Sequence, residues 1–348
     1  MFFSAKSTGF VLDQGEQTTL LARVSGLKPP LVVDAIKEFP TGDAAAFDEA
    51  LASLKPKNAS GFLQANCGIN PPGRFIRRAS LDPKRFKENE YLHEVVTSQF
   101  RIDEERSVIS VINAFDGLDF DAAKPNPQKE VVFCGLPVDE QKATQSALLE
   151  RGLFPARMEL ASLNALGAII DFLKFTDSQK PTLVLELGAE STQSYIVSSR
   201  GLEATRPIAV GLDAMVPVVQ KELGLKDEES ARKLFFSNTF DFTGMGSSLC
   251  RRLLKELQSS MGFYEVQTGQ SISQLICPVL PEKLVWLEAV IASQIGVSVL
   301  HPDFGPWLAA RQVTFSDTVS RQSLSSRHLA LLGLMIQFNS QPTHAVAS

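Results

Sequence analysis

The stretch 181–233 constrains the fold of this 348-residue chain more than any other. Apolar runs of strand length alternate there with Gly- and Ser-containing turns, and a helical pattern follows. This pattern predicts three strands joined by two tight turns, and then a helix that begins with a carboxylate cap and ends at a glycine. The predicted strands are 183–187, 192–198 and 202–209, the turns are 188–191 and 199–201, and the helix runs from Asp213 to Gly224.

The first turn of this stretch has the composition of an anion-binding hairpin. Glu186 lies near the end of one strand, Gly188 opens the turn, and Thr192 begins the next strand. Backbone N–H groups in such a turn can face an anion, an acidic residue can orient a metal-bound water, and a hydroxyl adds a donor. Any β-meander uses the same strand-turn-strand pattern, so the turn alone leaves a plain hairpin and a phosphate-binding hairpin both open.

The residues on either side of this hairpin resemble a known family. R-P-I-A-V-G-L-D at 206–213, a helix, and then L-G-L-K-D-E-E-S-A-R-K at 223–233 are similar to the PilM family of type IV pilus assembly proteins. Its members are actin-like proteins related to the cell-division protein FtsA. E-R-G-L-F-P-A-R-M-E-L-A-S-L-N-A-L-G at 150–167 matches a further family signature. The resemblance covers nearly the whole chain and is strongest from 131 to 234.

The resemblance implies an actin-like fold of the α/β class, with ribonuclease H-like repeats and two domains that each carry a small inserted subdomain. A chain of 348 residues is long enough for two domains with separate cores. We assign 1–73, 156–179 and 322–348 to the first subdomain and 74–155 to its insert. The second subdomain comprises 180–217 and 272–321, and its insert is 218–271.

Periodicity predicts several further helices. Asp43 should cap a helix over 43–54, and amphipathic spacing predicts helices over 87–100, 156–175, 247–264 and 325–338. The helix over 247–264 has a basic outer side formed by Arg251, Arg252 and Lys255, which we interpret as a solvated face.

Composition excludes several classes of function. The net charge of −5 argues against a protein that binds nucleic acid, because such a protein would show a basic face. The four cysteines form no C-x-x-C pair and the four histidines have no metal-ligand spacing, so we expect reduced thiols and no metal site. The most apolar segments, 284–300 and 329–338, are interrupted or short compared with the roughly 20 residues that a membrane span needs.

If the chain binds a nucleotide, the resemblance implies ATP with magnesium. Glu186 would then be the catalytic acid of an active ATPase. The nucleotide-binding residues would lie in the two phosphate hairpins and in the glycine that follows the third strand: Asp13, Gly15, Gly188, Ala189, Thr192 and Gly211.

Five departures from the family pattern argue against that ligand. Glu16 places a carboxylate where a β-phosphate oxygen would lie, with no Lys or Ser close by in the sequence. Glu186 is longer than the usual Asp. Arg232 and Phe235 stand where the family has Glu and Lys, and Pro278 begins a segment that replaces the glycine pair of the adenine turn. We therefore expect a pseudo-ATPase without a cofactor.

The resemblance also implies a partner. A PilM-like protein would bind the cytoplasmic N-terminal peptide of a PilN-like inner-membrane protein, and so lie in the cytoplasm at the inner membrane. The residues expected at the peptide are Arg74, Phe75, Arg77 and Arg78. Phe75 and Arg77 share one face of the strand because side chains alternate. A solvated strand edge remains an alternative for these residues. Pilus motor ATPases and a second copy of the chain are further partners that the resemblance allows. An FtsA-like filament former is an alternative function, beside the active ATPase.

Overall fold

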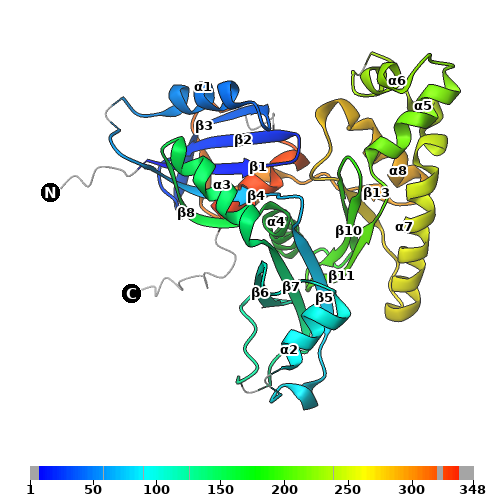
Figure 1. The fold of residues 1–348 in the computed structure, drawn as a ribbon, viewed down its shortest axis with the longest axis horizontal. Helices are drawn as coiled ribbons and strands as arrows, with labels where there is room; N and C mark the ends of the chain where they lie inside the picture. Colours follow the sequence, from blue (N-terminus) through cyan, green and yellow to red (C-terminus); the bar gives the residue numbers. More distant parts are fainter. Residues whose placement is uncertain are drawn as a thin grey trace. The chain divides into compact units, whose positions relative to one another are not determined.

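The computed structural model describes residues 8–57, 59–88, 90–124, 126–237, 239–319 and 324–336 (Figure 1). The chain divides into two compact units. The first comprises Met1–Phe172, Asp303–Leu324 and His328–Ser348, and the second comprises Leu173–Pro302 and Ser325–Arg327.

The first unit is built on a six-stranded sheet with the order β14-β3-β2-β1-β4-β8. Its first three strands form an antiparallel meander, whereas β4 runs parallel to β1, β8 to β4, and β14 to β3. The strands are β1 (Gly9–Gln14), β2 (Thr18–Val24), β3 (Leu31–Pro40), β4 (Leu63–Ile69), β8 (Leu153–Leu160) and β14 (Val313–Phe315).

Helices cover both faces of this sheet. The helices are α1 (Ala44–Leu54), α3 (Val138–Glu150), α4 (Ala161–Phe175), α9 (Phe304–Ala310) and α10 (Leu329–Met335). Side chains of α1 and α3 share one core cluster with Phe10, Leu12 and Cys67. On the opposite face of β4, a Cβ on Gly68 would lie 3.1 Å from Leu334 of α10 and 3.3 Å from Ala161 of α4. As expected, Asp43 caps α1, because its carboxylate accepts the Ala46 N–H at 2.9 Å.

The inserted segment of the first unit forms a three-stranded antiparallel sheet with the order β5-β7-β6. Its elements are β5 (Phe75–Ser80), η1 (Pro83–Arg85), α2 (Tyr91–Glu94), η2 (Val95–Gln99), β6 (Ser107–Asn113) and β7 (Glu130–Pro137). The helix predicted over 87–100 is wrong in its length, because it consists of the short α2 and one π-helical turn. That wider turn buries Val95 and Val96 together against Phe133 of β7.

The second unit repeats the plan of the first. Three antiparallel strands form a meander, and a later strand, β12, runs parallel to the first of them; the sheet order is β11-β10-β9-β12-β13. These strands are β9 (Thr182–Leu187), β10 (Thr192–Ser198), β11 (Gly201–Ile208), β12 (Gln274–Ile276) and β13 (Ser298–Val299). The three strands predicted in 181–233 are therefore confirmed.

The helices of the second unit form one large core with this sheet. They are η3 (Leu212–Met215), α5 (Val216–Glu222), α6 (Glu228–Phe235), η4 (Thr243–Met245), α7 (Gly246–Thr268), η5 (Glu282–Leu284) and α8 (Trp286–Ile295). Gly224 follows the end of α5 with φ of 60°, as expected for a glycine that ends a helix. Asp213 does not cap the helix, because it lies inside η3, whose cap position is Gly211.

Three further expectations differ from the structure. The segment 156–160, predicted as helix, belongs to β8, because parallel pairing with β4 extends it to Leu160. The segment 303–319, which the sequence analysis placed in the second domain, lies in the first unit, because β14 pairs with β3. The predicted last helix begins at Leu329 rather than 325, and its residues 337 and 338 lie outside the described residues.

Candidate functional sites

The second candidate phosphate hairpin connects β9 and β10. Gly188 donates its N–H to the Ser191 carbonyl at 3.0 Å and closes the turn. Thr192 begins β10 and is fully buried, and its hydroxyl donates to the Val210 carbonyl at 2.7 Å. The hydroxyl expected to contact a phosphate therefore holds the main chain that follows β11.

A short loop after β11 packs on this hairpin through its backbone. Leu212 donates its N–H to the Gly188 carbonyl, and Asp213 donates to the Ala189 carbonyl, both at 2.9 Å. A Cβ on Gly211 would lie 2.3 Å from the Ala189 oxygen, so only glycine allows this close approach. The structure thus brings Gly188, Ala189, Thr192 and Gly211 together, and the atoms that join them are backbone atoms and one hydroxyl.

Glu186, the expected catalytic acid, lies on β9 immediately before this hairpin. It is only 2% exposed, and Tyr195 of β10 donates its hydroxyl to the Glu186 carboxylate at 3.4 Å. A hydrogen bond from the tyrosine holds this carboxylate inside the second unit.

The first candidate hairpin connects β1 and β2 and carries Asp13 and Gly15. Asp13 is 7% exposed, and Gly15 donates its N–H to the Thr18 carbonyl at 3.0 Å. A guanidinium nitrogen of Arg74 lies 3.5 Å from the Glu16 carboxylate. No Lys or Ser lies close to Glu16 in the sequence, but the fold brings Arg74, 58 residues later in the chain, beside its carboxylate. The sequence did not predict the Arg74–Glu16 pair, because the two residues are far apart in the chain.

Aromatic packing occupies the position where the family pattern has a lysine. Phe235 of α6 is fully buried and meets three rings edge-on, with centroid distances of 5.0 Å to Phe236, 5.7 Å to Phe242 and 6.4 Å to Trp286. A cation at this position would be surrounded by hydrocarbon.

The neighbouring position, where the family pattern has a glutamate, holds an arginine that is already paired. Arg232 lies 2.7 Å from the Asp213 carboxylate, and this hydrogen bond raises the pKa of Arg232. The pair joins α6 to η3, which follows β11, so the arginine has a structural partner within its own unit.

The segment that begins at Pro278, where the resemblance places the adenine turn, is held by a hydrogen bond to Glu288. The sequence did not predict this role for Glu288. Glu288 of α8 accepts the Cys277 N–H at 2.6 Å, immediately before Pro278. Glu288 is 8% exposed, and its burial raises the pKa of the carboxyl group. The available signal was a single charged side chain within the helix WLEAVIASQI.

The candidate partner residues lie on or next to β5, an outer strand of the inserted sheet. Phe75 is 8% exposed, and its ring packs over Gly135 of β7, where a Cβ would lie 2.7 Å from the ring. Arg78 pairs with Glu130 at 2.7 Å, and Arg77 donates to the Ile76 carbonyl at 3.1 Å. Phe75 and Arg77 pair in register with Gly135 and Phe133, so they share one face as expected.

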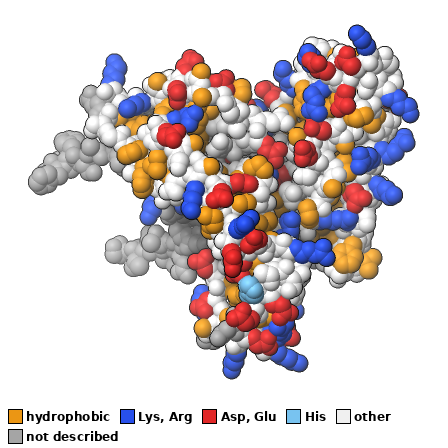
Figure 2. Space-filling view, viewed as in Figure 1, with side chains coloured by type: hydrophobic (Ala, Val, Ile, Leu, Met, Phe, Trp, Pro, Cys, Tyr) orange, Lys and Arg blue, Asp and Glu red, His pale blue; other side chains and the backbone are white. Residues whose placement is uncertain are grey.

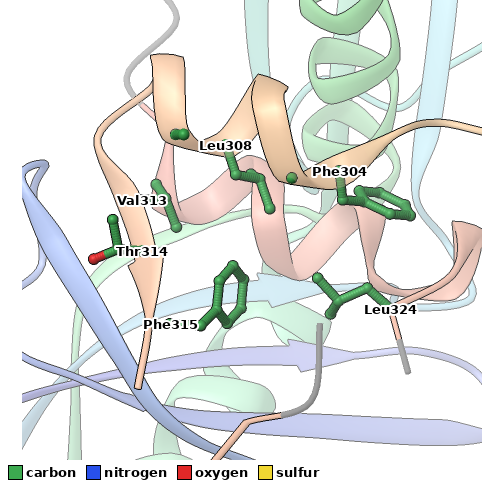
Figure 3. A pocket seen from close by; sticks show the side chains of 8 residues that line it. Phe304, Leu308, Val313, Thr314, Phe315 and Leu324 are labelled. Atoms are coloured by element: carbon green, nitrogen blue, oxygen red, sulfur yellow. The ribbon is translucent and has the colours of Figure 1, made fainter. Parts of the chain in front are cut away.

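A small depression in the first unit lies between α9 and β14 (Figure 3). It has a volume of about 270 Å³, part of which is open to solvent. Phe304, Leu308, Val313 and Leu324 contribute apolar side chains to it, and Thr314 is the polar residue of its described lining. This lining offers neither an acid, a base nor a cation for chemistry.

The described residues contain neither a metal-ligand cluster nor a membrane-spanning helix. Within the ranges that the structure describes, no group of three or more His, Cys, Asp or Glu side chains could hold a metal ion. No helix among those residues is both long enough and apolar enough to cross a membrane. The four cysteines are free and buried, and burial raises the pKa of Cys67, Cys134 and Cys250 to about 12.

Comparison with known proteins identifies the fold. No family model and no curated protein matches the sequence. The structure is similar to a solved "PilM-PilN type IV pilus biogenesis complex", with 18% identity, a TM-score of 0.66, and coverage of 94% of this chain and 97% of that chain. Weaker likenesses are to the ethanolamine utilization protein EutJ from Carboxydothermus hydrogenoformans (12% identity, 94% and 88% coverage, TM-score 0.44) and to the archaeal actin homolog Ta0583 (11%, 93% and 98%, TM-score 0.41). The chain has the actin-like α/β fold.

Proposed function

We propose that this protein is a PilM-like scaffold of a type IV pilus or related secretion machine. It binds the N-terminal cytoplasmic peptide of a PilN-like membrane protein and is held at the inner membrane through that partner. The observation that carries the proposal is the likeness to the PilM–PilN complex, which extends over 94% of this chain and 97% of that one. The likeness supports the proposal because the two proteins share a fold. The position of the peptide site rests on the strand pairing of the inserted sheet.

The proposed docking element is the backbone of β5. In the part of the chain that the structure describes, β5 pairs only with β7, so its other edge is open to strand addition. The Leu81 N–H donates to the Lys129 carbonyl at 2.7 Å, which continues the β5–β7 register. Because antiparallel pairing alternates, the backbone groups of Ile76 and Arg78 point away from β7.

Under this proposal, Phe75 supports the site rather than forming a contact with the peptide. Its ring is buried over Gly135 and fixes the position of β5 against β7. Arg77 donates to the Ile76 carbonyl, one of the backbone groups that an added strand would use. Peptide binding would therefore displace the Arg77 guanidinium.

We also propose that the protein has no ATPase activity and binds no nucleotide usefully. The Thr192 hydroxyl, the Phe235 side chain and the Cys277 N–H are all engaged within the second unit. Thr192 and Phe235 occupy positions where the family pattern places a group that contacts nucleotide, and Cys277 immediately precedes the segment that replaces the glycine pair. An actin-like scaffold can keep its two-unit fold without this ligand.

The experiment tests strand addition with two variants of one residue. Arg78→Pro removes the outward N–H of β5, whereas Arg78→Ala keeps that N–H; both remove the ion pair with Glu130. We expect Arg78→Ala to bind a PilN-like N-terminal peptide within about threefold of wild type, and Arg78→Pro to bind at least about tenfold more weakly. Fluorescence anisotropy with a labelled peptide measures the affinity, and circular dichroism confirms the fold. Wild-type affinity in a folded Arg78→Pro variant would refute docking at β5.

A further inference from the structure

The outer face of α7 carries both cations and exposed apolar side chains. Its inner face supplies Leu249, Leu253, Leu257 and Met261 to the core of the second unit. Opposite these lie exposed basic residues in the first half of the helix, and Phe263 and Val266 near its end, which are 65% and 87% exposed. Figure 2 shows blue side chains along the region of α7 and a hydrophobic patch at its lower end. The basic residues are Arg251, Arg252 and Lys255.

Helical spacing puts these side chains on one stripe. Arg252, Lys255, Ser259, Phe263 and Val266 follow one another at intervals of three or four residues, so they line one side of α7. From Arg251 to Val266 the stripe is about 22 Å long at the α-helical rise. It is a continuous convex ridge with its cations at one end and its apolar groups at the other.

Two of the acidic groups near this ridge are paired with other arginines. Glu256 pairs with Arg206 at 2.7 Å, and Glu203 pairs with Arg200 at 3.0 Å. No ion pair to the three cations of the ridge is found among the described residues. Their charge is therefore available to an external anion.

The shape and size of the ridge favour a lipid surface over a protein. A stable protein interface covers about 800 Å² per partner, whereas a ridge about 22 Å long and 10 Å wide covers roughly 220 Å². A bilayer needs no enclosing groove, because its headgroups accept cations while aromatic and aliphatic side chains enter the boundary with the acyl chains. The chain as a whole carries a net charge of −5. An anionic membrane therefore repels most of the protein surface and attracts the basic ridge, which orients the protein as it approaches the membrane.

We propose that the outer face of α7 binds an anionic lipid surface directly. Arg251, Arg252 and Lys255 contact the headgroups, and Phe263 and Val266 enter the interface. This contact does not depend on the peptide site at β5, and it would add to attachment through a partner protein.

The test is flotation of the full chain with vesicles of phosphatidylglycerol and phosphatidylcholine in equal parts, and with vesicles of phosphatidylcholine alone. We expect binding to the anionic vesicles only, weakened by salt. The variant R251E/R252E/K255E should bind roughly 100-fold more weakly, since each cation near an anionic surface contributes about one kcal/mol. F263S/V266S should lower binding roughly tenfold without removing the difference between the two lipid compositions.

The matched control is K221E/K226E/K233E, which reverses the charge of three other exposed lysines of the same unit. It therefore makes the same change in net charge as R251E/R252E/K255E. We expect it to bind anionic vesicles within about threefold of wild type, because no Lys of this set lies on the ridge. Absence of wild-type binding to anionic vesicles, or an equal loss in the control, would overturn the proposal. A further outcome would also overturn the proposal: the wild-type chain self-associates in sedimentation, R251E/R252E/K255E does not, and neither binds vesicles. That result would show that a second copy of the chain covers α7.

Discussion

Replacement of Phe235 by alanine tests whether this side chain is part of the core of the second unit. Phe235 is fully buried and contacts Phe236, Phe242 and Trp286 edge-on. Truncation removes all three ring contacts and leaves a cavity at the centre of the aromatic cluster. If Phe235 had instead been a lining residue of an open nucleotide site, its removal would cost little.

The expected cost follows from burial. Large-to-small substitutions of fully buried aromatic residues reduce the free energy of unfolding by about 3–5 kcal/mol. Phe263→Ala makes the same chemical change at a side chain that is 65% exposed, so it should cost less than about 0.5 kcal/mol. Phe235→Lys should be at least as damaging as Phe235→Ala, because it buries a charge without a partner.

Tryptophan fluorescence during urea unfolding measures these differences in the second unit. The chain has two tryptophans, so a W307F background leaves Trp286, which stacks on Phe242 with a centroid distance of 5.9 Å. We expect the midpoint to fall sharply for Phe235→Ala and to stay near that of the background for Phe263→Ala. A loss below about 1 kcal/mol for Phe235→Ala, or a stable Phe235→Lys variant, would refute the core assignment.

Two further predictions concern the same unit. Because burial raises the pKa of Glu288, folding disfavours its ionised form at neutral pH, and this cost disappears as pH falls below the ordinary range of a glutamate. Glu288→Gln, which keeps an acceptor for the Cys277 N–H, should therefore raise the urea midpoint at pH 8 and change it little at pH 4; an equal effect at both pH values would contradict this reasoning. Millimolar Mg-ATP should leave the melting temperature unchanged relative to magnesium alone, whereas a ligand at 100 times its Kd would stabilise the fold by about 2.7 kcal/mol.

The sequence predicted the parts of the fold that depend on local patterns. The meander of β9, β10 and β11 has apolar runs separated by glycine turns, and periodicity alone locates it. β8 was not predicted, because its residues Leu153–Leu160 lead directly into a helix and only pairing with β4 makes them a strand. β14 is three residues long and follows a short helix, so nothing local indicates that it joins the first sheet.

In the candidate sites, too, the sequence indicates contacts between residues in neighbouring strands and turns, but not contacts between residues far apart in the chain. Gly188, Thr192 and Gly211 lie near one another, because strand order and turn length fix their distance. The Arg74–Glu16 pair and the Glu288–Cys277 hydrogen bond join residues whose relation depends on tertiary packing. Neither follows from spacing along the chain.

Polar groups of the second hairpin hold neighbouring elements of the second unit together. In this chain the Thr192 hydroxyl donates to Val210, and the carbonyls of Gly188 and Ala189 accept from the loop after β11. Arg232 extends this set of contacts through Asp213 to α6. Hydrogen bonds and one ion pair thus connect β9, β10, the loop after β11 and α6 within the second unit. The Thr192 hydroxyl and the carbonyls of Gly188 and Ala189 therefore have hydrogen-bond partners within the second unit, so these three polar groups are satisfied by the chain itself.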